Sequence, residues 1–293
     1  MRGIIPAMVS LNQVLSESLS MGADGTARLT LASALQGFPE AAHGGGIVAA
    51  FDAAAARGIP PTTPRTVAVQ IQKSIPLETP LPLAIRASGG DVTLVLGDHG
   101  QPLARGRVTP AAADPAPQWG ATVPAGEGRA VPTSRGCVAC GSENPLGLRV
   151  RLRFDERWVW SEYRPPDTCL TPDGRIAPAL FSVLLDEMAW WLGALASGEA
   201  GVTTELTVAL HRPSQLFGNT LLAVGARDRV AAAGERGHFW KTEAAVLASD
   251  GALLASGAIT FAGSRAYSKR RIPRLLTMNP PEILRPIFPK YVP

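Results

Sequence analysis

The chain has 293 residues, of which 46% are hydrophobic and 18% are charged, and its formal net charge is +4. This length favours two domains over one, and the apolar fraction excludes wholesale disorder. A charge of +4 is a weak field for a chain of this size, and the aromatic residues do not interleave with a basic stripe, so nucleic-acid binding is not expected. Three cysteines, an odd number, argue against a disulfide scaffold and favour a reducing, cytoplasmic location.

Targeting and membrane signals are weak. Asn12 and Glu17 interrupt the apolar stretch near the N-terminus, which does not fit a signal peptide. Residues 176–196 are long and apolar enough to span a bilayer, but Asp186 and Glu187 lie in their middle. Each acid would cost about 2.5–3.5 kcal/mol at a membrane centre. We therefore expect a buried helix and no membrane span.

The chain reads as two copies of one unit. In the first, a strand at 26–32 and a glycine run precede a short apolar helix at 47–57 and strands beginning near residues 66, 81, 91 and 103. The second has strands at 149–154 and 158–163, a long apolar helix at 179–196, and strands at 203–211, 220–230, 238–248 and 253–261. Helices without a polar face must be covered on all sides, so the two units are expected to pack together.

Composition sets the unit boundaries. The sequence predicts an N-terminal unit at 1–110, a Pro/Gly-rich linker at 111–135, a C-terminal unit at 136–263 and a basic, Pro-rich tail at 264–293. We expect this tail to lie over the surface or to be partly disordered.

Two motifs point to a family. His43-Gly44-Gly45 is followed by six residues and then Asp52, and residues 137–148 read C-V-A-C-G-S-E-N-P-L-G-L. Both patterns resemble the hotdog-fold acyl-CoA thioesterases of the phenylacetate-pathway type, here in a tandem double-hotdog form. The resemblance implies an α+β fold in which two antiparallel sheets each wrap around a central helix and pack as a pseudo-dimer.

The same resemblance implies a function. It indicates a thioesterase of lipid metabolism that hydrolyses an acyl-CoA or acyl-carrier-protein thioester. Coenzyme A would be part of the substrate and no separate cofactor is expected. A homo-oligomer of double hotdogs is compatible with this interpretation. The rivals are a non-catalytic acyl-CoA or lipid-binding protein and an enoyl-CoA hydratase-like enzyme, although the Asp-x4-His arrangement expected of a hydratase is missing from the start of either central helix.

In dimers of this family, the glycine turn of one unit faces the helix acid of the other. One composite site would then join His43, Gly44 and Gly45 to Asp186, with the glycine N–H groups at a helix N-terminus stabilising an oxyanion and Asp186 acting as base or nucleophile. The second would join residues 177–179 to Asp52. Because Pro178 has no N–H, we expect only the first to work. The bland alternatives are that Asp52 is structural, that His43 holds the turn, and that Glu187 points to the other face of its helix.

Further residues are candidates for substrate contact. Lys73 and Arg212 end matching strands of the two copies and could meet coenzyme A phosphates, as could the basic run 269–271, although a solvated tail fits that run equally well. The full set of predicted substrate-binding residues is Gly46, Lys73, Glu187, Trp190, Thr203, Thr204 and Arg212.

The pair Cys137-x-x-Cys140 is half of a zinc-type ligand set. Cys169 has no histidine near it in sequence, and completing the set would take His211 or His238 from a distant strand. The sequence therefore predicts no metal, and the family resemblance implies a structural role for the pair.

Overall fold

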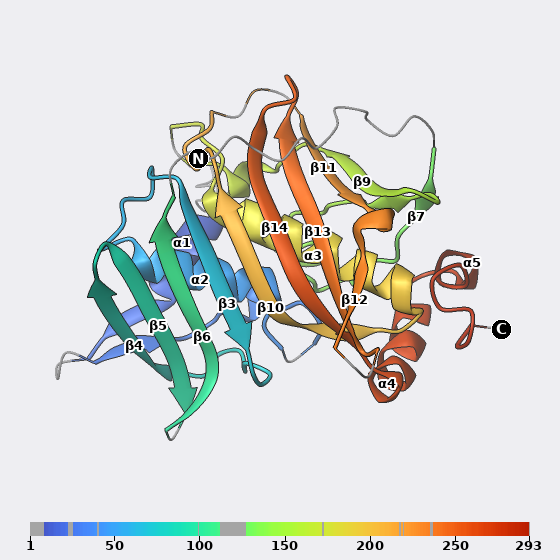
Figure 1. The fold of residues 1–293 in the computed structure, drawn as a ribbon, viewed down its shortest axis with the longest axis horizontal. Coiled ribbons are helices and arrows are strands. Elements are labelled where there is room, and N and C mark those ends of the chain that lie inside the picture. Colours follow the sequence, from blue (N-terminus) through green and yellow to red (C-terminus); the bar gives the residue numbers. More distant parts are fainter. Residues whose placement is uncertain are drawn as a thin grey trace, which may run out of the picture.

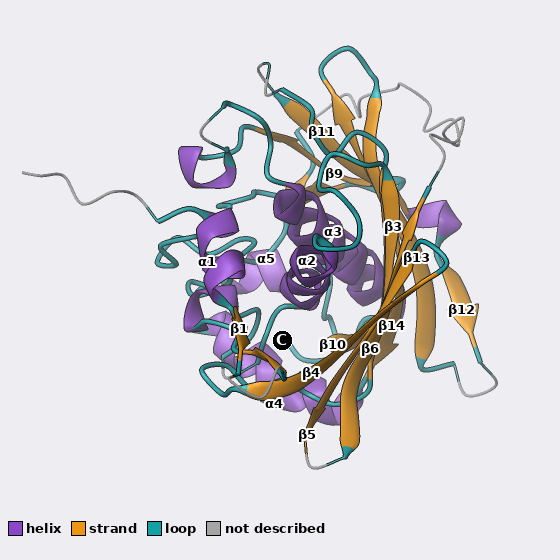
Figure 2. Ribbon diagram, turned by 90° about the vertical axis from the view of Figure 1, so that its left-hand side faces the viewer, coloured by secondary structure: helices purple, strands orange, loops and turns teal. Residues whose placement is uncertain are grey.

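The structure, a computed structural model, describes residues 9–22, 26–39, 41–98, 100–111, 127–171, 173–216, 218, 220–234 and 237–292. The described strands form one antiparallel sheet, and the helices lie together on its concave side (Figures 1 and 2). The sheet wraps around two central helices that contact each other. This arrangement buries both apolar helices, as their lack of a polar face requires.

The first half of the chain supplies α1 (Leu11–Glu17), the central helix α2 (Gly44–Ala55) and the strands β1 (Leu19–Met21), β2 (Ala27–Leu29), β3 (Arg65–Ile71), β4 (Leu81–Ser88), β5 (Asp91–Asp98) and β6 (Gln101–Pro110). The second half supplies β7 (Arg129–Ala130), β8 (Arg153–Phe154), β9 (Trp158–Tyr163), the central helix α3 (Pro178–Ser197), β10 (Gly201–Leu210), β11 (Leu221–Ala226), β12 (Ala231–Ala233), β13 (Phe239–Ala248), β14 (Leu253–Gly263), α4 (Arg265–Leu276) and α5 (Pro281–Leu284).

The two copies join edge to edge through β3 and β10. These strands pair antiparallel, with Gln70 opposite Glu205 and Arg65 opposite Leu210. The strand order is β1-β2-β4-β5-β6-β3-β10-β14-β13-β11-β9-β8-β7, and β12 pairs with β13 outside this path. The two sheets expected from the sequence are therefore one continuous surface, as in a dimer whose subunits share a sheet.

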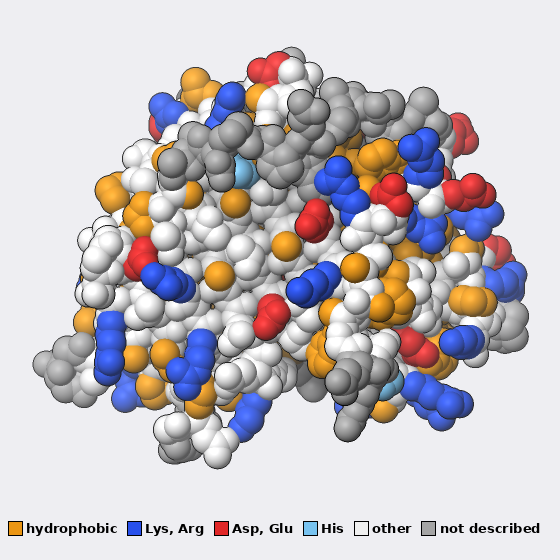
Figure 3. Space-filling view, viewed as in Figure 1, with side chains coloured by type: hydrophobic (Ala, Val, Ile, Leu, Met, Phe, Trp, Pro, Cys, Tyr) orange, Lys and Arg blue, Asp and Glu red, His pale blue; other side chains and the backbone are white. Residues whose placement is uncertain are grey.

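The outer face of the sheet is polar and mixed in charge. Figure 3 shows basic and acidic side chains interspersed over β3, β6, β10 and β14, with scattered hydrophobic side chains between them. Along β10 the residues facing the helices, such as Leu206 and Val208, are buried, while Glu205 and Thr207 between them are exposed. This alternation places one face of the sheet on the core and the other in solvent.

Helix α3 is the segment that is long and apolar enough to span a bilayer. Its mean hydropathy is 1.4 over an 18-residue window, and 89% of that window is buried inside the protein. The sheet covers it through β10, β13 and β14, and α2 lies beside it. The apolar composition of α3 is thus explained by its place in the core.

Two sequence expectations, the strand at 149–154 and the loosely held tail, need correction, and the predicted linker lies mostly outside the described residues. Of the strand expected at 149–154, only Arg153–Phe154 pairs as β8. The tail is not loosely held, because it forms α4 and α5 and buries Ile272, Leu284 and Phe288. Most of the predicted linker, residues 112–126, falls outside the described residues.

Candidate active site between the two central helices

Helix α2 begins in tight contact with α3. A Cβ atom added to Gly45 would lie 2.2 Å from the carbonyl oxygen of Ser182, and one added to Gly44 would lie 2.7 Å from Oδ2 of Asp186. Only glycine allows the two helices to approach this closely. His43 is the N-cap residue of α2, so the first N–H groups of this helix point toward the middle of α3.

Asp186 receives these donors. Its Oδ2 accepts a hydrogen bond of 2.9 Å from the backbone N–H of Gly45 and lies 3.1 Å from Nδ1 of His43. Its Oδ1 accepts a hydrogen bond of 2.8 Å from the hydroxyl of Thr203 at the start of β10. Asp186 is 4% exposed, and the positive end of the α2 dipole stabilises the charge of its carboxylate. The structure thus brings together His43, Gly45 and Asp186 from opposite halves of the chain.

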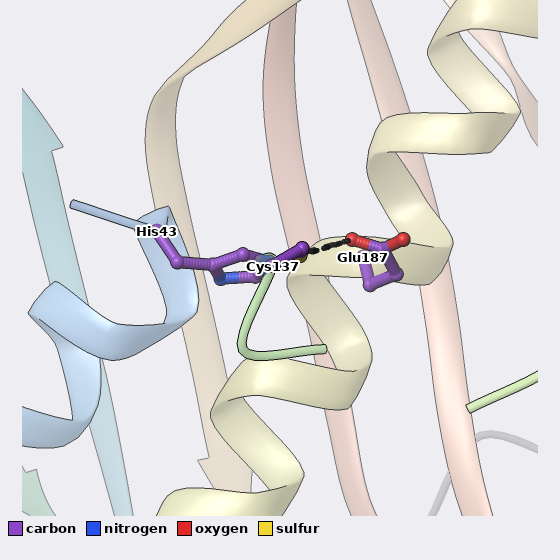
Figure 4. A group of neighbouring side chains, drawn as sticks. All are labelled: His43, Cys137 and Glu187. Atoms are coloured by element: carbon purple, nitrogen blue, oxygen red, sulfur yellow. Dashed lines mark hydrogen bonds and ion pairs between the residues drawn. The ribbon is translucent and has the colours of Figure 1, made fainter. Parts of the chain in front are cut away.

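Glu187, the next residue of α3, faces His43, as Asp186 does. It does not point to the other face of the helix, which the sequence had offered as the alternative. Its Oε2 lies 3.4 Å from Nε2 of His43 and 3.9 Å from Sγ of Cys137. Its Oε1 accepts a hydrogen bond of 3.1 Å from the indole N–H of Trp191. Figure 4 shows His43, Cys137 and Glu187 pointing toward one another from the start of α2, from a loop and from α3.

These contacts shift the pKa of His43 and of Glu187. Burial alone would lower the pKa of His43, but Asp186, with further contributions from Cys137 and Glu187, outweighs burial and holds the pKa well above its usual value. Burial likewise opposes the charge on Glu187, yet His43 and Trp191 keep the pKa of its carboxyl lowered. In its protonated form, which these neighbours favour, His43 directs Nδ1–H at Asp186 and Nε2–H at Glu187, and the Gly45 N–H donates to Asp186.

The two cysteines shift apart in pKa. A hydrogen bond from Cys140 lowers the pKa of Cys137 to about 6, against the opposing effects of burial and of Glu187. The same hydrogen bond, together with burial, raises the pKa of Cys140. Cys137 is thus the thiol of the pair that ionises first.

A cavity of about 480 Å³ opens onto this cluster. Its lining includes eight of the residues that the sequence predicted for the site: His43, Gly44, Lys73, Asp186, Glu187, Trp190, Thr203 and Thr204. Gly45 contributes its N–H to Asp186 from behind this lining, and Gly46 is buried in the next position of α2. Trp190 also packs against Phe38 and Phe261, so it is both wall and core.

Asp52 lies apart from this cavity and is already paired. Its Oδ1 accepts 2.5 Å from Nε of Arg65, and its Oδ2 accepts 2.6 Å from a terminal nitrogen of the same side chain. Arg65 also donates to the carbonyl oxygens of Pro61 and Thr63. Both residues are buried. The prediction of Asp52 as a catalytic residue is therefore not supported by its surroundings, which give it a structural role.

Lys73 and Arg212 end at opposite ends of the joint sheet. Because β3 and β10 run antiparallel, the end of β3 lies beside the start of β10, where Thr203 is. Lys73 therefore reaches the cavity, whereas Arg212 is eight residues beyond Thr204, roughly 26 Å away along a strand, and is exposed. The two residues thus occupy matching places in their own copies, where their backbone N–H groups donate to Leu103 and Leu254, but only Lys73 lines this cavity.

The tail helix α4 lines the cavity with Arg270 and Arg271, which belong to the basic run that the sequence offered as a phosphate contact, and with Tyr267, which sequence reasoning missed. Cys137 and Cys140 also line it. Their CxxC spacing was the available signal, but His43 and Glu187, far away in sequence, were not recognised as their neighbours.

No family model and no curated protein matches this sequence. Solved structures do match. A hot dog fold protein of Alicyclobacillus acidocaldarius is 16% identical with a TM-score of 0.59, over 86% of this chain and 97% of that one. A protein of Thermobifida fusca YX described as a thioesterase II is 14% identical with a TM-score of 0.61, over 88% and 100%.

The acyl-CoA thioesterase II TesB2 of Mycobacterium marinum is 14% identical with a TM-score of 0.52, over 88% of this chain and 100% of that one. Dehydratases, CurJ and GphF, are also among the matches. At these identities the likeness concerns the fold, and each matched chain is covered over nearly its whole length. The chain therefore has an α+β double-hotdog fold, the architecture of thioesterase II enzymes.

Proposed function

We propose that this protein hydrolyses an acyl-CoA or acyl-carrier-protein thioester at the single site formed by His43, Gly45 and Asp186. Asp186 acts as base toward water or as nucleophile, and the N–H of Gly45 stabilises the oxygen that becomes negative. No separate cofactor is required, since coenzyme A arrives with the substrate. A cytoplasmic location and an assembly of several double hotdogs are part of the same proposal.

One observation carries this proposal. The N–H of Gly45 and the carboxylate of Asp186, one donor and one base, meet at 2.9 Å beside the cavity. Thioester hydrolysis needs these two groups on either side of one carbonyl. When a substrate carbonyl takes the N–H of Gly45, Asp186 keeps the hydroxyl of Thr203 on Oδ1, and Oδ2 loses one of its two donors, keeps His43, and can act on the carbonyl carbon or its attacking water.

The wall of the cavity suits an anionic thioester. Lys73, Arg270 and Arg271 line it, while Ile47, Ile71 and Trp190 supply apolar surface. Cationic side chains match the phosphates of coenzyme A, and apolar ones match an acyl chain. The carboxylates of Asp186 and Glu187 are each held by donors, so they do not present an unpaired negative charge to the substrate.

A second function is favoured by one contact. His43 and Asp186 form a histidine–acid pair, Nδ1 to Oδ2 at 3.1 Å, and such pairs move protons in hydration and dehydration. A hydratase would use His43 rather than Gly45 as the key group. However, both ring nitrogens of His43 face carboxylates, which leaves no free nitrogen for a substrate proton.

A panel of acyl-CoA thioesters with detection of free thiol tests the proposal. Wild-type protein should release thiol, and Asp186→Asn should lower the rate about 10²–10⁴-fold, the range for loss of a general base. The matched variant Asp52→Asn, assayed per folded molecule, should retain the wild-type rate. Ligand-induced thermal stabilisation without thiol release would instead indicate a non-catalytic binding protein. Addition of water to an enoyl-CoA, measured as the loss of ultraviolet absorbance of its conjugated double bond, would indicate the hydratase.

A further inference from the structure

We propose that His43, Cys137 and Glu187 bind one Zn²⁺ ion. Each residue offers one ligand-type atom, and the three atoms all lie within 4.8 Å of one another. Oε2 of Glu187 lies 3.4 Å from Nε2 of His43 and 3.9 Å from Sγ of Cys137. With the usual zinc bond lengths, ligand atoms at two corners of a tetrahedron lie about 3.3–3.6 Å apart, and these two separations lie within a few tenths of an ångström of that range.

The far side of each ligand is already held. Nδ1 of His43 faces Asp186 at 3.1 Å, and Oε1 of Glu187 accepts 3.1 Å from the indole of Trp191. Sγ of Cys137 accepts 3.3 Å from the N–H of Ala139. A carboxylate behind the ligating histidine and donors behind the other ligands are the outer contacts that orient zinc ligands. They leave Nε2, Oε2 and one face of the sulfur directed at a common point.

The loop that carries Cys137 is built to hold it there. The N–H of Gly141 donates 2.9 Å to the carbonyl of Cys137, and a Cβ atom at Gly141 would lie 2.3 Å from that oxygen. Asn144 ties the loop to the first half of the chain by donating 2.8 Å to the carbonyl of Ala34. The C-x-x-C-G-x-x-N pattern thus makes a rigid turn that presents a thiol to α2 and α3.

Charge favours a divalent cation at this point. Cys137 as a thiolate and Glu187 as a carboxylate carry two negative charges, which the charge of one Zn²⁺ ion equals, and Asp186 adds a further buried carboxylate behind His43. Nitrogen and sulfur donors select zinc over magnesium or calcium. All three ligands line the cavity, so the fourth position opens toward it and is taken by water. This differs from the sequence expectation of no metal, in which completing the ligand set of the cysteine pair would have taken His211 or His238.

Metal binding can be measured without any substrate. Reduced protein, stripped with a chelator and incubated with ZnCl₂, should retain one equivalent of zinc after desalting. Loading with Co²⁺ should give a thiolate-to-cobalt absorption band. Cys137→Ser should abolish this band and Glu187→Gln should weaken zinc binding at least tenfold, a usual loss for a ligand or its support. Cys169→Ser is the matched control, because Cys169 is buried but lies outside the cluster, and it should bind like wild type.

X-ray absorption at the zinc edge covers the case of a variant that does not fold. Wild-type protein should show one sulfur near 2.3 Å and nitrogen or oxygen neighbours near 2.0–2.1 Å. Retention of substoichiometric zinc by reduced wild-type protein, a first shell without sulfur, or unchanged zinc affinity in a folded Cys137→Ser variant would overturn the proposal. Because these measurements use no thioester, they stand or fall separately from hydrolysis.

Discussion

Arg65 holds the carboxylate of Asp52 with two nitrogens, at 2.5 and 2.6 Å. Arg65 begins β3 of the first copy, and Thr203, near the start of β10 in the second, donates a hydrogen bond to Asp186. Asp186 also accepts from the backbone N–H of Gly45 and faces Nδ1 of His43, whereas Asp52 is paired with a guanidinium of its own copy. The two helix acids of the repeat thus have different partners, and only Asp186 lies in the lining of the cavity.

Breaking this pair should cost stability rather than activity. Asp52→Asn leaves Arg65, which is 3% exposed, without its counter-charge, and removal of one partner from a buried pair typically costs about 3–5 kcal/mol. The free energy of unfolding in urea measures this loss. Asp173→Asn, which removes the partner of Arg175 at the surface, is the control and should unfold like wild type. Equal stability of the two variants would contradict the structural role of Asp52.

Adjacent glycines of α2 should respond in opposite ways to alanine. Gly45→Ala places a Cβ atom 2.2 Å from the Ser182 carbonyl, so α2 must move away from α3. Overpacking of this kind typically costs about 1–3 kcal/mol. At Gly46 the nearest atom would be 3.5 Å away, and alanine is the better helix former, by about 1 kcal/mol. Urea unfolding and thioester hydrolysis should be measured for both variants. A loss in Gly45→Ala alone would show that the close contact of α2 with α3 is required, and an equal loss in Gly46→Ala would contradict this.

Thr203 and Thr204 are neighbours whose hydroxyls have different acceptors, so their variants distinguish the hydrogen bond to Asp186 from general packing. Thr203 donates 2.8 Å to Asp186, whereas Thr204 donates 3.0 Å to the carbonyl of Thr260. Thr203→Val should lower kcat roughly fivefold, as expected for loss of a hydrogen bond of about 1 kcal/mol in the transition state. Thr203→Ser should restore the rate, and Thr204→Val should leave it near wild type. Equal effects of the two valine variants would assign the loss to packing.

The stability of metal-free protein should depend on pH through His43 and Glu187. The folded pKa of His43 is raised above 6.5, so its contribution is fully present below pH 6.5 and is lost as the pH rises through the raised value. The folded pKa of Glu187 is lowered below 4.5, so its contribution is present above pH 4.5 and is lost as the pH falls through the lowered value. Urea unfolding should show one loss as the pH falls well below 4.5 and another as it rises well above 6.5, and His43→Gln should remove the alkaline one.

Much of this fold was readable because local patterns decide it. The alternation of β10, the apolar run of α3 and the internal repeat each predict an element and its burial without knowledge of the rest. The pairing of His43 with Asp186 across the repeats was also predicted, because a repeat that mimics a dimer brings the start of one central helix to the middle of the other. The structure places these groups at 3.1 Å.

The remaining features depend on contacts between distant segments. Glu187 was assigned to the wrong face because neighbouring helical positions point about 100° apart, and a helix wrapped by partners on every side gives no clue to which direction is the site. The tail was expected at the surface because its composition is basic and Pro-rich, yet Ile272 and Phe288 are fully buried. Spaced apolar residues among charges were a signal for an amphipathic helix that the overall composition concealed.

Arg271 provides a last test, which concerns the substrate. Its guanidinium lies over the rings of Phe38 and Tyr267, at 4.9 and 5.0 Å from their centroids, and it lines the cavity. Among the buried side-chain nitrogen and oxygen atoms of the described residues, its Nε is the one that has no hydrogen-bond partner. A charged group with an unused donor at a cavity wall is suited to binding a phosphate.

Arg271→Met should therefore raise KM for acyl-CoA about tenfold, the effect of one charge-assisted hydrogen bond of roughly 1.5 kcal/mol, and leave kcat unchanged. The same variant should hydrolyse the corresponding acyl-pantetheine, which lacks the nucleotide phosphates, with the wild-type KM. Lys269→Met, on the exposed side of α4, is the control and should change neither value. If KM rises equally for both thioesters, Arg271 contacts the acyl or pantetheine portion instead, since those are the only parts the two substrates share.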